Sequence, residues 1–315
     1  MPLSDSPAVA ILGPTASGKS RLALLLAGRF HGEIVSCDAL QIYRGMDIGT
    51  AKPNALERDA VPHHMLDLLD PGEEYSAGDY QRQARSELLS ISGRGSIPFV
   101  AGGTGFYLRA LIDGLFEGPG RSEELRLRMR RIIGRRGAGA LHRALARVDP
   151  QAASRIARTD ASRIIRAYEV WLLTGKTMSW WQAQPSNRLC GFRWLKLAIH
   201  WPREVLYERI DRRVEDMIRA GFTLEVQGLM ARLPRDCQAF KAIGYRQIAD
   251  YVDGRSSLEQ AVEDIQRESR RYAKRQMTWF RSLPDLRWLD ASRCWDDCES
   301  AAMRVVNEFL ALPNS

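Results

Sequence analysis

The stretch that decides the fold is Ala8–Ser20, which reads AVAILGPTASGKS. An apolar run suited to a buried strand leads into Gly13, and four residues later come Gly18, Lys19 and Ser20. This is the G-x-x-x-x-G-K-[ST] phosphate loop in its proper setting, with a strand before it and a helix after it. We therefore predict a P-loop NTPase-like α/β fold, in which helices flank a parallel sheet.

The loop residues suit a di- or triphosphate. Glycines let backbone N–H groups curl around the anion, and the N-terminus of the next helix adds partial positive charge. Lys19 can reach the outer phosphate, and the Ser20 hydroxyl is placed to bind Mg2+. An ordinary glycine-rich turn is the weaker alternative, and the motif does not name the reaction. The predicted phosphate-binding residues are Gly13, Pro14, Thr15, Ala16, Ser17, Gly18, Lys19 and Ser20.

Composition limits the class of protein. The 315 residues allow one large or two medium domains. The sequence contains neither an apolar run of membrane-spanning length nor a recognisable signal segment at its start, so we expect a soluble protein. The five cysteines are scattered and odd in number, which favours a reducing cytoplasm over a disulfide framework.

The positive charge is concentrated in two segments. Residues 120–176 hold fourteen basic and five acidic residues, a net charge of +9, whereas the whole chain carries only +8. A second basic segment, residues 266–293, has eight basic against three acidic residues. Each alone is more simply a solvated helix face. Together, and interleaved with tryptophan and tyrosine, they favour a nucleic acid as partner.

The first part of the chain alternates strands and helices. Residues 33–37 are predicted as a strand that ends at Asp38, and residues 97–101 as a strand that runs into Gly102–Gly105. Ligands of parallel sheets lie at the carboxyl ends of strands, so Asp38 and Thr104 belong near the phosphate loop. Asp38 can bind Mg2+ through water, act as a general base, or cap the next turn, and its local sequence favours the cap. For Thr104, a plain strand-to-helix turn is an equal alternative.

The alternation stops at the glycines of residues 114–120. Residues 122–181 are helical in character and rich in arginine, and a strand is again predicted at 192–199. We expect a catalytic core formed by residues 1–117 and 191–315, and a helical, arginine-rich insertion at 118–190 that binds the nucleic acid. In the last third, residues 202–219 form a helix with several arginines, a common source of cations for phosphates.

Several sequence motifs along the chain are unusual. They are the phosphate loop itself, Asp38-x-x-Gln41-x-Tyr43-Arg44-x-Met46-Asp47-Ile-Gly-Thr-Ala-Lys-Pro53, His63-His64-x-x-Asp67, Gly102-Gly-Thr-Gly105, Gly244-Tyr-Arg-Gln247 and Ala273-Lys-Arg-Gln-x-Thr-Trp279. In this order the chain resembles the bacterial-type tRNA dimethylallyltransferase family over nearly its whole length. It departs from the family at Ala39-Leu40, where a serine is frequent. The sequence shows no match to the C-terminal zinc finger of eukaryotic members, and we therefore expect a bacterial-type enzyme.

The resemblance implies a reaction. The family transfers a dimethylallyl group from dimethylallyl diphosphate to the exocyclic amine of adenosine 37 of tRNA, next to the anticodon, and releases diphosphate. It implies that Asp38 is the base, and that Thr104, Mg2+ and an arginine stabilise the leaving diphosphate. For that arginine we choose Arg213, with Arg209 and Arg212 as rivals. A monomeric cytoplasmic enzyme is expected.

The resemblance also implies tRNA contacts in four parts of the chain. These are Asp38, Ala39, Leu40 and Gln41; Thr104; Arg126 with Ser162, Arg163, Ile164, Ile165 and Arg166; and Lys241, Ala242, Ile243, Gly244, Tyr245 and Arg246. Two other functions would use the same loop. The first is a kinase of a nucleoside or small molecule, which would leave the positive charge of the insertion unexplained. The second is an RNA-binding NTPase switch, which would leave the motifs around Asp38 and Thr104 unexplained.

Overall fold

The computed structural model describes residues 5–312 and divides them into two compact units. Unit 1 comprises residues up to 112 and from 189 onward, and unit 2 comprises residues 113–188. The predicted insertion, 118–190, falls within a few residues of unit 2. The first and last residues of the predicted core, 1–4 and 313–315, lie outside the described residues.

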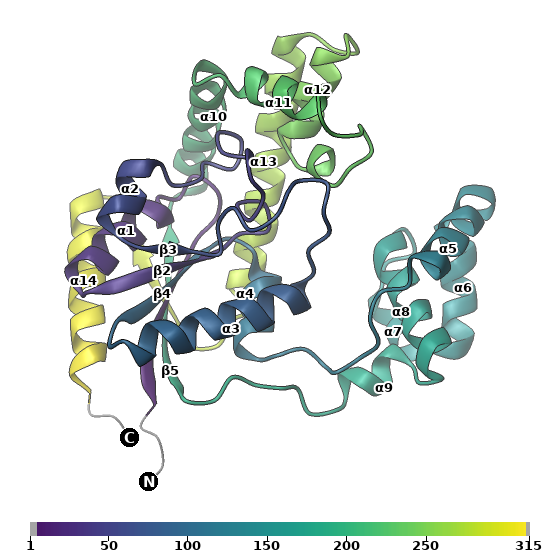
Figure 1. Ribbon diagram of the computed structural model, residues 1–315, viewed down its shortest axis with the longest axis horizontal. Coiled ribbons are helices and arrows are strands. Elements are labelled where there is room, and N and C mark those ends of the chain that lie inside the picture. Colours follow the sequence, from purple (N-terminus) through teal and green to yellow (C-terminus); the bar gives the residue numbers. More distant parts are fainter. Residues whose placement is uncertain (1–4, 313–315) are drawn as a thin grey trace. The chain divides into compact units, whose positions relative to one another are not determined.

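Unit 1 is built on a six-stranded parallel sheet in the order β3-β2-β4-β1-β5-β6 (Figure 1). The central strands are almost wholly buried on both faces, which is why they are near-continuous apolar runs. The strands are β1 (Ser6–Leu12), β2 (Gly32–Cys37), β3 (His63–His64), β4 (Ile97–Gly102), β5 (Phe192–His200) and β6 (Leu286–Asp290).

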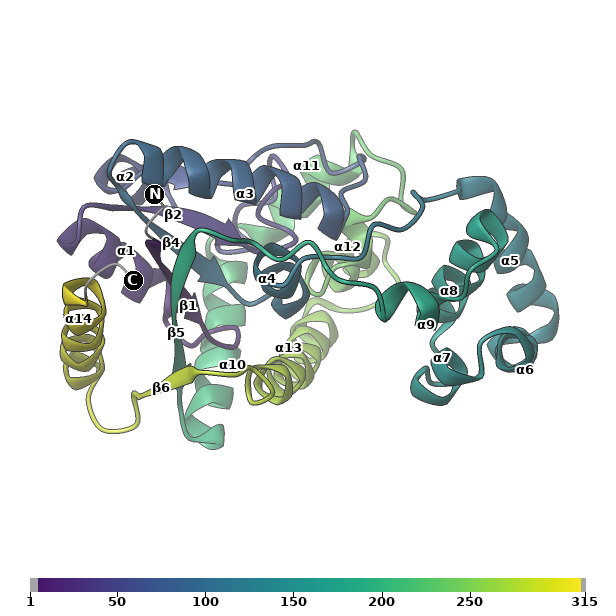
Figure 2. The ribbon, with the colours of Figure 1, turned by 90° about the horizontal axis from the view of Figure 1, so that it is seen from below.

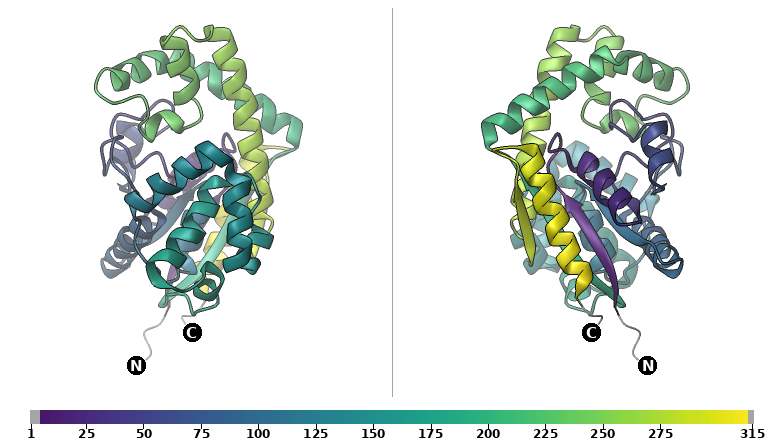
Figure 3. Two further views of the ribbon diagram at one scale, coloured as in Figure 1. Left: turned by 90° about the vertical axis from the view of Figure 1, so that its right-hand side faces the viewer. Right: turned by 90° about the vertical axis from the view of Figure 1, so that its left-hand side faces the viewer.

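Helices cover both faces of this sheet (Figure 2). One face packs against α3 (Ala77–Gly93) and α4 (Gly105–Ile112), with Tyr80, Leu88 and Leu108 in the shared core. The other face packs against α1 (Lys19–Arg29) and α14 (Trp295–Ala311), through residues such as Leu22 and Val306. The right-hand view of Figure 3 shows α1 and α14 side by side.

A third core of unit 1 lies around the loop that follows β2. It joins Ile42, Tyr43 and Met46 of that loop to apolar side chains of a helical group. Four helices make up most of this group, in which α13 contains the first half of the basic segment 266–293. They are α10 (Arg203–Arg219), α11 (Phe222–Met230), α12 (Tyr245–Val252) and α13 (Leu258–Phe280), with the short η1 (Ala239–Lys241) before α12 and α2 (Ala55–Ala60) after the loop.

Unit 2 is entirely helical among its described elements, as its sequence predicts. Its own core contains Met129, Leu145 and Ile164, which come from three different helices. The helices are α5 (Glu123–Arg136), α6 (Ala138–Val148), α7 (Pro150–Arg155), α8 (Ala161–Thr174) and α9 (Met178–Gln182).

Strand register fixes where the predicted site residues leave the sheet. Leu12, Gly102 and Cys37, the last residues of β1, β4 and β2, are paired across these neighbouring strands. The next residues along the chain, Gly13, Gly103 and Asp38, therefore emerge together at the carboxyl edge, where parallel sheets bind ligands. Within residues 5–312, no helix is long and apolar enough to cross a membrane.

Candidate active site

The phosphate loop has the strained backbone that its function requires. Ala16 and Gly18 both have positive φ, 63° and 93°, and α1 begins directly after Gly18. A residue with a Cβ atom is strained in this conformation, whereas glycine adopts it without strain. The Lys19 amine lies 3.5 Å from the Pro14 carbonyl oxygen, so it points back over the loop. Ser20 is exposed at the start of α1.

Gln276 of α13 holds the phosphate loop against the second glycine turn. Its side-chain oxygen accepts the Thr15 N–H at 3.0 Å, and its side-chain nitrogen donates to the Gly103 carbonyl at 2.9 Å. Gln276 is buried, so both bonds are shielded from water. It belongs to the motif Ala273-Lys-Arg-Gln, within the basic segment 266–293 that the sequence assigns to nucleic-acid binding. Its role is to fix the spacing of the two loops.

Asp38 lies beside cations at the end of β2. Its Oδ1 accepts the Leu40 N–H at 2.9 Å, so the capping interpretation is correct for one carboxylate oxygen. Burial and the positive charge of Arg213 lower the pKa of Lys19 to about 8, although Asp38 opposes them. Burial also lowers the pKa of Arg213, again opposed by Asp38. Lys19 and Arg213 are therefore both within electrostatic range of Asp38.

Thr104 begins the turn into α4 and bonds to the residue after Asp38. Its Oγ1 accepts the Ala39 N–H at 3.2 Å, and its own N–H donates to the Cys37 carbonyl at 3.2 Å. Burial, followed by the charge of Asp38, raises the pKa of the Tyr272 phenol to about 12, although a hydrogen bond with Thr104 opposes this. Tyr272 is thus a neutral hydroxyl close to both predicted catalytic side chains.

One cavity of about 830 Å3 in unit 1 brings these residues together. It is large enough for a diphosphate and an attached group. Its walls come from the phosphate loop, the ends of β2 and β4, and helices α10 and α13. Predicted residues that line it are Thr15, Ala16, Gly18, Lys19, Ser20, Asp38, Ala39, Leu40, Gln41, Thr104, Arg213, Lys241, Ala242, Ile243 and Gly244, together with both rival arginines, Arg209 and Arg212.

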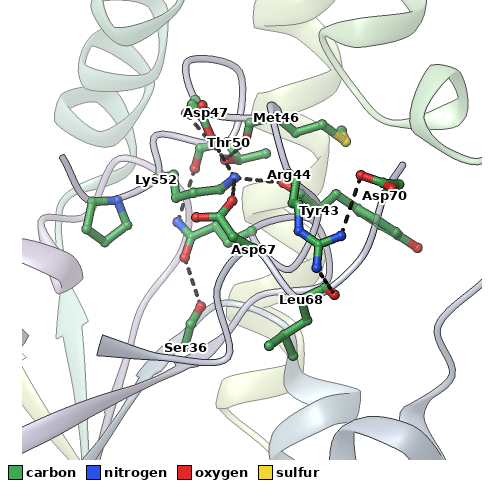
Figure 4. Close-up of polar contacts among 12 residues, drawn as sticks. Ser36, Tyr43, Arg44, Met46, Asp47, Thr50, Lys52, Asp67, Leu68 and Asp70 are labelled. Atoms are coloured by element: carbon green, nitrogen blue, oxygen red, sulfur yellow. Dashed lines mark hydrogen bonds and ion pairs between the residues drawn. The ribbon is translucent and has the colours of Figure 1, made fainter. Parts of the chain in front are cut away.

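The loop of residues 41–53 forms another wall of the cavity, and hydrogen bonds and ion pairs hold it in place (Figure 4). The buried Lys52 amine donates to the Tyr43 carbonyl at 2.7 Å and pairs with Asp47 at 2.5 Å and Asp67 at 2.7 Å. Glu225 of α11 accepts three consecutive loop N–H groups, the closest at 2.7 Å. These anchors give a structural reason for the long motif of this loop.

The predicted tRNA segment 241–246 is only partly accessible. Lys241 and Arg246 are exposed, and Arg246 pairs with Glu268 at 2.6 Å. Tyr245, in contrast, is fully buried and its hydroxyl donates to Glu225 at 2.7 Å. The Tyr245 side chain is therefore packed in the third core and supports the loop, and a tRNA contact at this position stays a prediction.

The predicted tRNA residues of unit 2 also separate into two groups. Ser162 and Arg163 are exposed, but Ile164 and Ile165 are buried in the core of the unit. The side chains of these two isoleucines pack in that core, and tRNA contact at their positions stays a prediction. Arg126 and Arg166 both bind the buried Glu169 carboxylate, at distances of 2.6–2.8 Å.

Together the fold and the site define a class: a phosphate-loop enzyme with a carboxylate, a threonine and cations at one cavity. The family model described as "IPP transferase" matches residues 41–283, and the chain belongs to this family. A tRNA dimethylallyltransferase from Solibacter usitatus is 48% identical over 305 residues, covering 96% of this chain and 99% of the relative.

Two solved structures support the same family assignment. The chain resembles a tRNA isopentenylpyrophosphate transferase from Bacillus halodurans with a TM-score of 0.72 and 40% identity, covering 97% of each chain. It resembles a eukaryotic dimethylallyltransferase, described as acting on tRNA, with a TM-score of 0.82 and 27% identity, covering 97% of this chain and 80% of that one.

Proposed function

We propose that the protein transfers a dimethylallyl group from dimethylallyl diphosphate to the exocyclic amine of adenosine 37 in tRNA. The observation that carries the proposal is the shared cavity. It places a phosphate loop, a carboxylate and a second glycine turn within one space. The names of the similar proteins give the same reaction class.

Asp38 is the proposed general base. The adenine amine is a weak nucleophile because its lone pair is conjugated with the ring, so removal of its proton during attack helps the reaction. One oxygen of Asp38 is held by the Leu40 N–H, which fixes the carboxylate, and the side chain lines the cavity. In the step, the amine nitrogen bonds to the allylic carbon, the carbon–oxygen bond breaks, and the amine proton passes to Asp38.

The leaving diphosphate departs with the electron pair of the broken bond and needs positive partners. The phosphate loop N–H groups, Lys19 and Arg213, all at this cavity, supply them. Arg213 is preferred over its rivals, because Arg209 donates to the Ala16 carbonyl and Arg212 is exposed. Arg213 is also the one whose charge acts on Lys19.

The residues present fit a Mg2+ ion. Mg2+ prefers oxygen ligands and usually takes most of them from water and substrate phosphates. The exposed Ser20 hydroxyl and the nearby Asp38 carboxylate are oxygen donors on the same cavity. Ser20 would hold the ion directly and Asp38 through water. When bound, Mg2+ neutralises charge on the departing diphosphate.

The tRNA is proposed to contact the basic parts of each unit. Arg163 in unit 2 and Lys241 and Arg275 in unit 1 are exposed cations, and the last two lie at or beside the cavity. Adenosine 37 must leave the anticodon stack to enter the cavity, as bases do in other enzymes that modify them. We further propose that the enzyme works as a monomer in the cytoplasm.

A donor comparison tests the proposal. The protein is incubated with Mg2+ and an unmodified tRNA bearing adenosine 37, with either labelled dimethylallyl diphosphate or γ-labelled ATP. A transcript with guanosine at position 37 is the matched control. We expect isoprenoid label in the adenosine transcript alone. Transfer of phosphate from ATP to a small acceptor, without isoprenoid transfer, would contradict the proposal and favour a kinase.

A further inference from the structure

Four side chains form a continuous stack behind the phosphate loop. Arg21 lies over the Trp295 ring, 5.1 Å from its centroid. Trp295 and Trp201 are stacked, with centroids 6.2 Å apart and planes inclined by 5°. Arg209 lies over the Trp201 ring at 4.4 Å. These distances are within the range of aromatic stacking and cation–π attraction. We call this group, Arg21–Trp295–Trp201–Arg209, the stacked ladder.

The ladder contacts three consecutive loop residues. Arg209 Nε donates to the Ala16 carbonyl at 2.9 Å, and Trp201 Nε1 donates to the Ser17 carbonyl at 2.9 Å. The Trp295 ring lies against Gly18, where a Cβ atom would come within 2.5 Å of Trp295 Cη2. Two carbonyls of the loop are thus bonded on the ladder side, and the backbone between them is fixed.

A phosphate loop binds its anion with N–H groups, and it does so best when these are oriented before the ligand arrives. Ala16 and Gly18 have positive φ, a conformation that persists when the surroundings hold it in place. Because the carbonyls are bonded on the ladder side, the loop resists rotation of the peptide units that would turn N–H groups away from the anion.

We infer that Trp295 is a positioning residue for the diphosphate, and that it acts through the stacked ladder on the backbone of residues 16–18. This inference rests on the proposed function, since it assumes that a diphosphate occupies the loop. It extends the site to α14, which lies outside the segment 41–283 matched by the family model.

Trp295 is itself fixed by its neighbours. Its Nε1 donates to the carboxylate of Glu299, one helical turn further along α14. Glu299 also pairs with Arg21 at 3.2 Å, so the second turn of α14 is joined to the first turn of α1 at the end of the ladder. The indole therefore has one orientation, which a smaller apolar side chain would not reproduce.

The test compares Trp295→Leu, which keeps an apolar side chain but removes the ring, with Trp295→Phe, which keeps a ring for the stack. Trp288→Leu is the matched control, because Trp288 is another half-exposed tryptophan, on β6, that contacts His200 instead of the loop. Binding of inorganic pyrophosphate is measured by calorimetry, and KM and kcat are measured for dimethylallyl diphosphate and for tRNA.

We expect Trp295→Leu to weaken pyrophosphate binding and to raise KM for dimethylallyl diphosphate by roughly ten-fold, the scale of one lost aromatic stack. KM for tRNA should be unchanged, Trp295→Phe should recover most of the loss, and Trp288→Leu should match the wild type. A general loss of folding would instead lower the fraction of active enzyme, and therefore kcat, without a selective rise in KM for dimethylallyl diphosphate.

Two results overturn the inference. If the wild type binds pyrophosphate and Trp295→Leu binds it equally well, the ladder does not position the loop. If the wild type binds neither pyrophosphate nor dimethylallyl diphosphate, the proposed function fails and the inference fails with it. Should Trp295→Leu not fold, Glu299→Gln replaces it, with a smaller rise in the dissociation constant expected and an unchanged constant contradicting the inference.

Discussion

Replacing Glu169 with glutamine should selectively destabilise the helical unit. Glu169 of α8 is fully buried and accepts hydrogen bonds from Arg126, Arg166 and the Ser122 N–H. Burial alone raises its pKa, but these bonds outweigh burial and lower the pKa from 4.5 to about 2. A carboxylate with a lowered pKa in the folded state stabilises the fold when it is ionised.

The size of the effect follows from this difference in pKa. Each ten-fold change in an acid constant corresponds to about 1.4 kcal/mol, so the ionised Glu169 contributes about 3 kcal/mol to the stability of unit 2. The contribution is complete above pH 4.5 and is lost as the pH falls toward 2. Glutamine keeps the shape and one acceptor but loses the charge, so above pH 4.5 it should remove most of this stabilisation, and the difference from the wild type should shrink as the pH falls toward 2.

Hydrogen exchange of the full-length protein, followed by mass spectrometry, measures the effect locally. At pH 7, peptides from α5 and α8 should exchange roughly 100-fold faster in Glu169→Gln, whereas peptides from β1 and β4 should not change. Glu123→Gln is the control, because Glu123 pairs with Arg121 and Arg130 in the same unit but is 48% exposed. Equal exchange of α8 in the wild type and in Glu169→Gln would refute the reasoning.

Three further predictions concern unit 1. Because the pKa of Lys19 is lowered to about 8, affinity for dimethylallyl diphosphate should fall as the pH rises through 8, and a titration of Lys19→Met should show weak binding without this inflection. Arg213→Met should slow single-turnover transfer by about 100-fold while the exposed Arg212→Met is near normal, and equal rates in both would reject the choice of Arg213. Lys52→Met removes the amine that binds Asp67 and the Tyr43 carbonyl, so the free energy of unfolding measured in urea should fall by about 3 kcal/mol. An unchanged unfolding midpoint would contradict this prediction.

The central part of the fold was predictable because local signals agree with one another. The phosphate loop fixes a strand and a helix, and the strands ending at Asp38 and before Gly103 are short apolar runs. Their boundaries differ from the structure by only one or two residues, as for β2 and β4. Parallel strands share one carboxyl edge, so the meeting of Asp38, Thr104 and the phosphate loop followed from sequence.

Other features depend on contacts between distant parts of the chain. Strand β6 is mostly exposed and lacks a buried run, so its sequence gives no clear strand pattern. Arg209, Arg212 and Arg213 lie within two turns of one helix, and only packing shows that Arg209 faces the loop carbonyls. Tyr245 lies in a recognisable sequence motif, but the motif does not show whether the side chain is buried in the core or exposed to a ligand.

The roles of Trp201 and Trp295 could not be predicted from the sequence either, because the two rings are 94 residues apart in the chain and meet only in the folded protein. Both lie outside the two basic segments whose aromatic residues favour nucleic-acid binding, so the sequence assigned them no role. In the structure they stack on each other and on arginines behind the phosphate loop.

The most direct test of the account is single-turnover transfer by Asp38→Asn, at saturating tRNA and dimethylallyl diphosphate, with mass spectrometry of the nucleoside at position 37. Asparagine keeps the acceptor for the Leu40 N–H but cannot take the amine proton. The account predicts transfer at least about 100-fold slower at saturating concentrations of both substrates. Transfer by Asp38→Asn at the wild-type rate would contradict it.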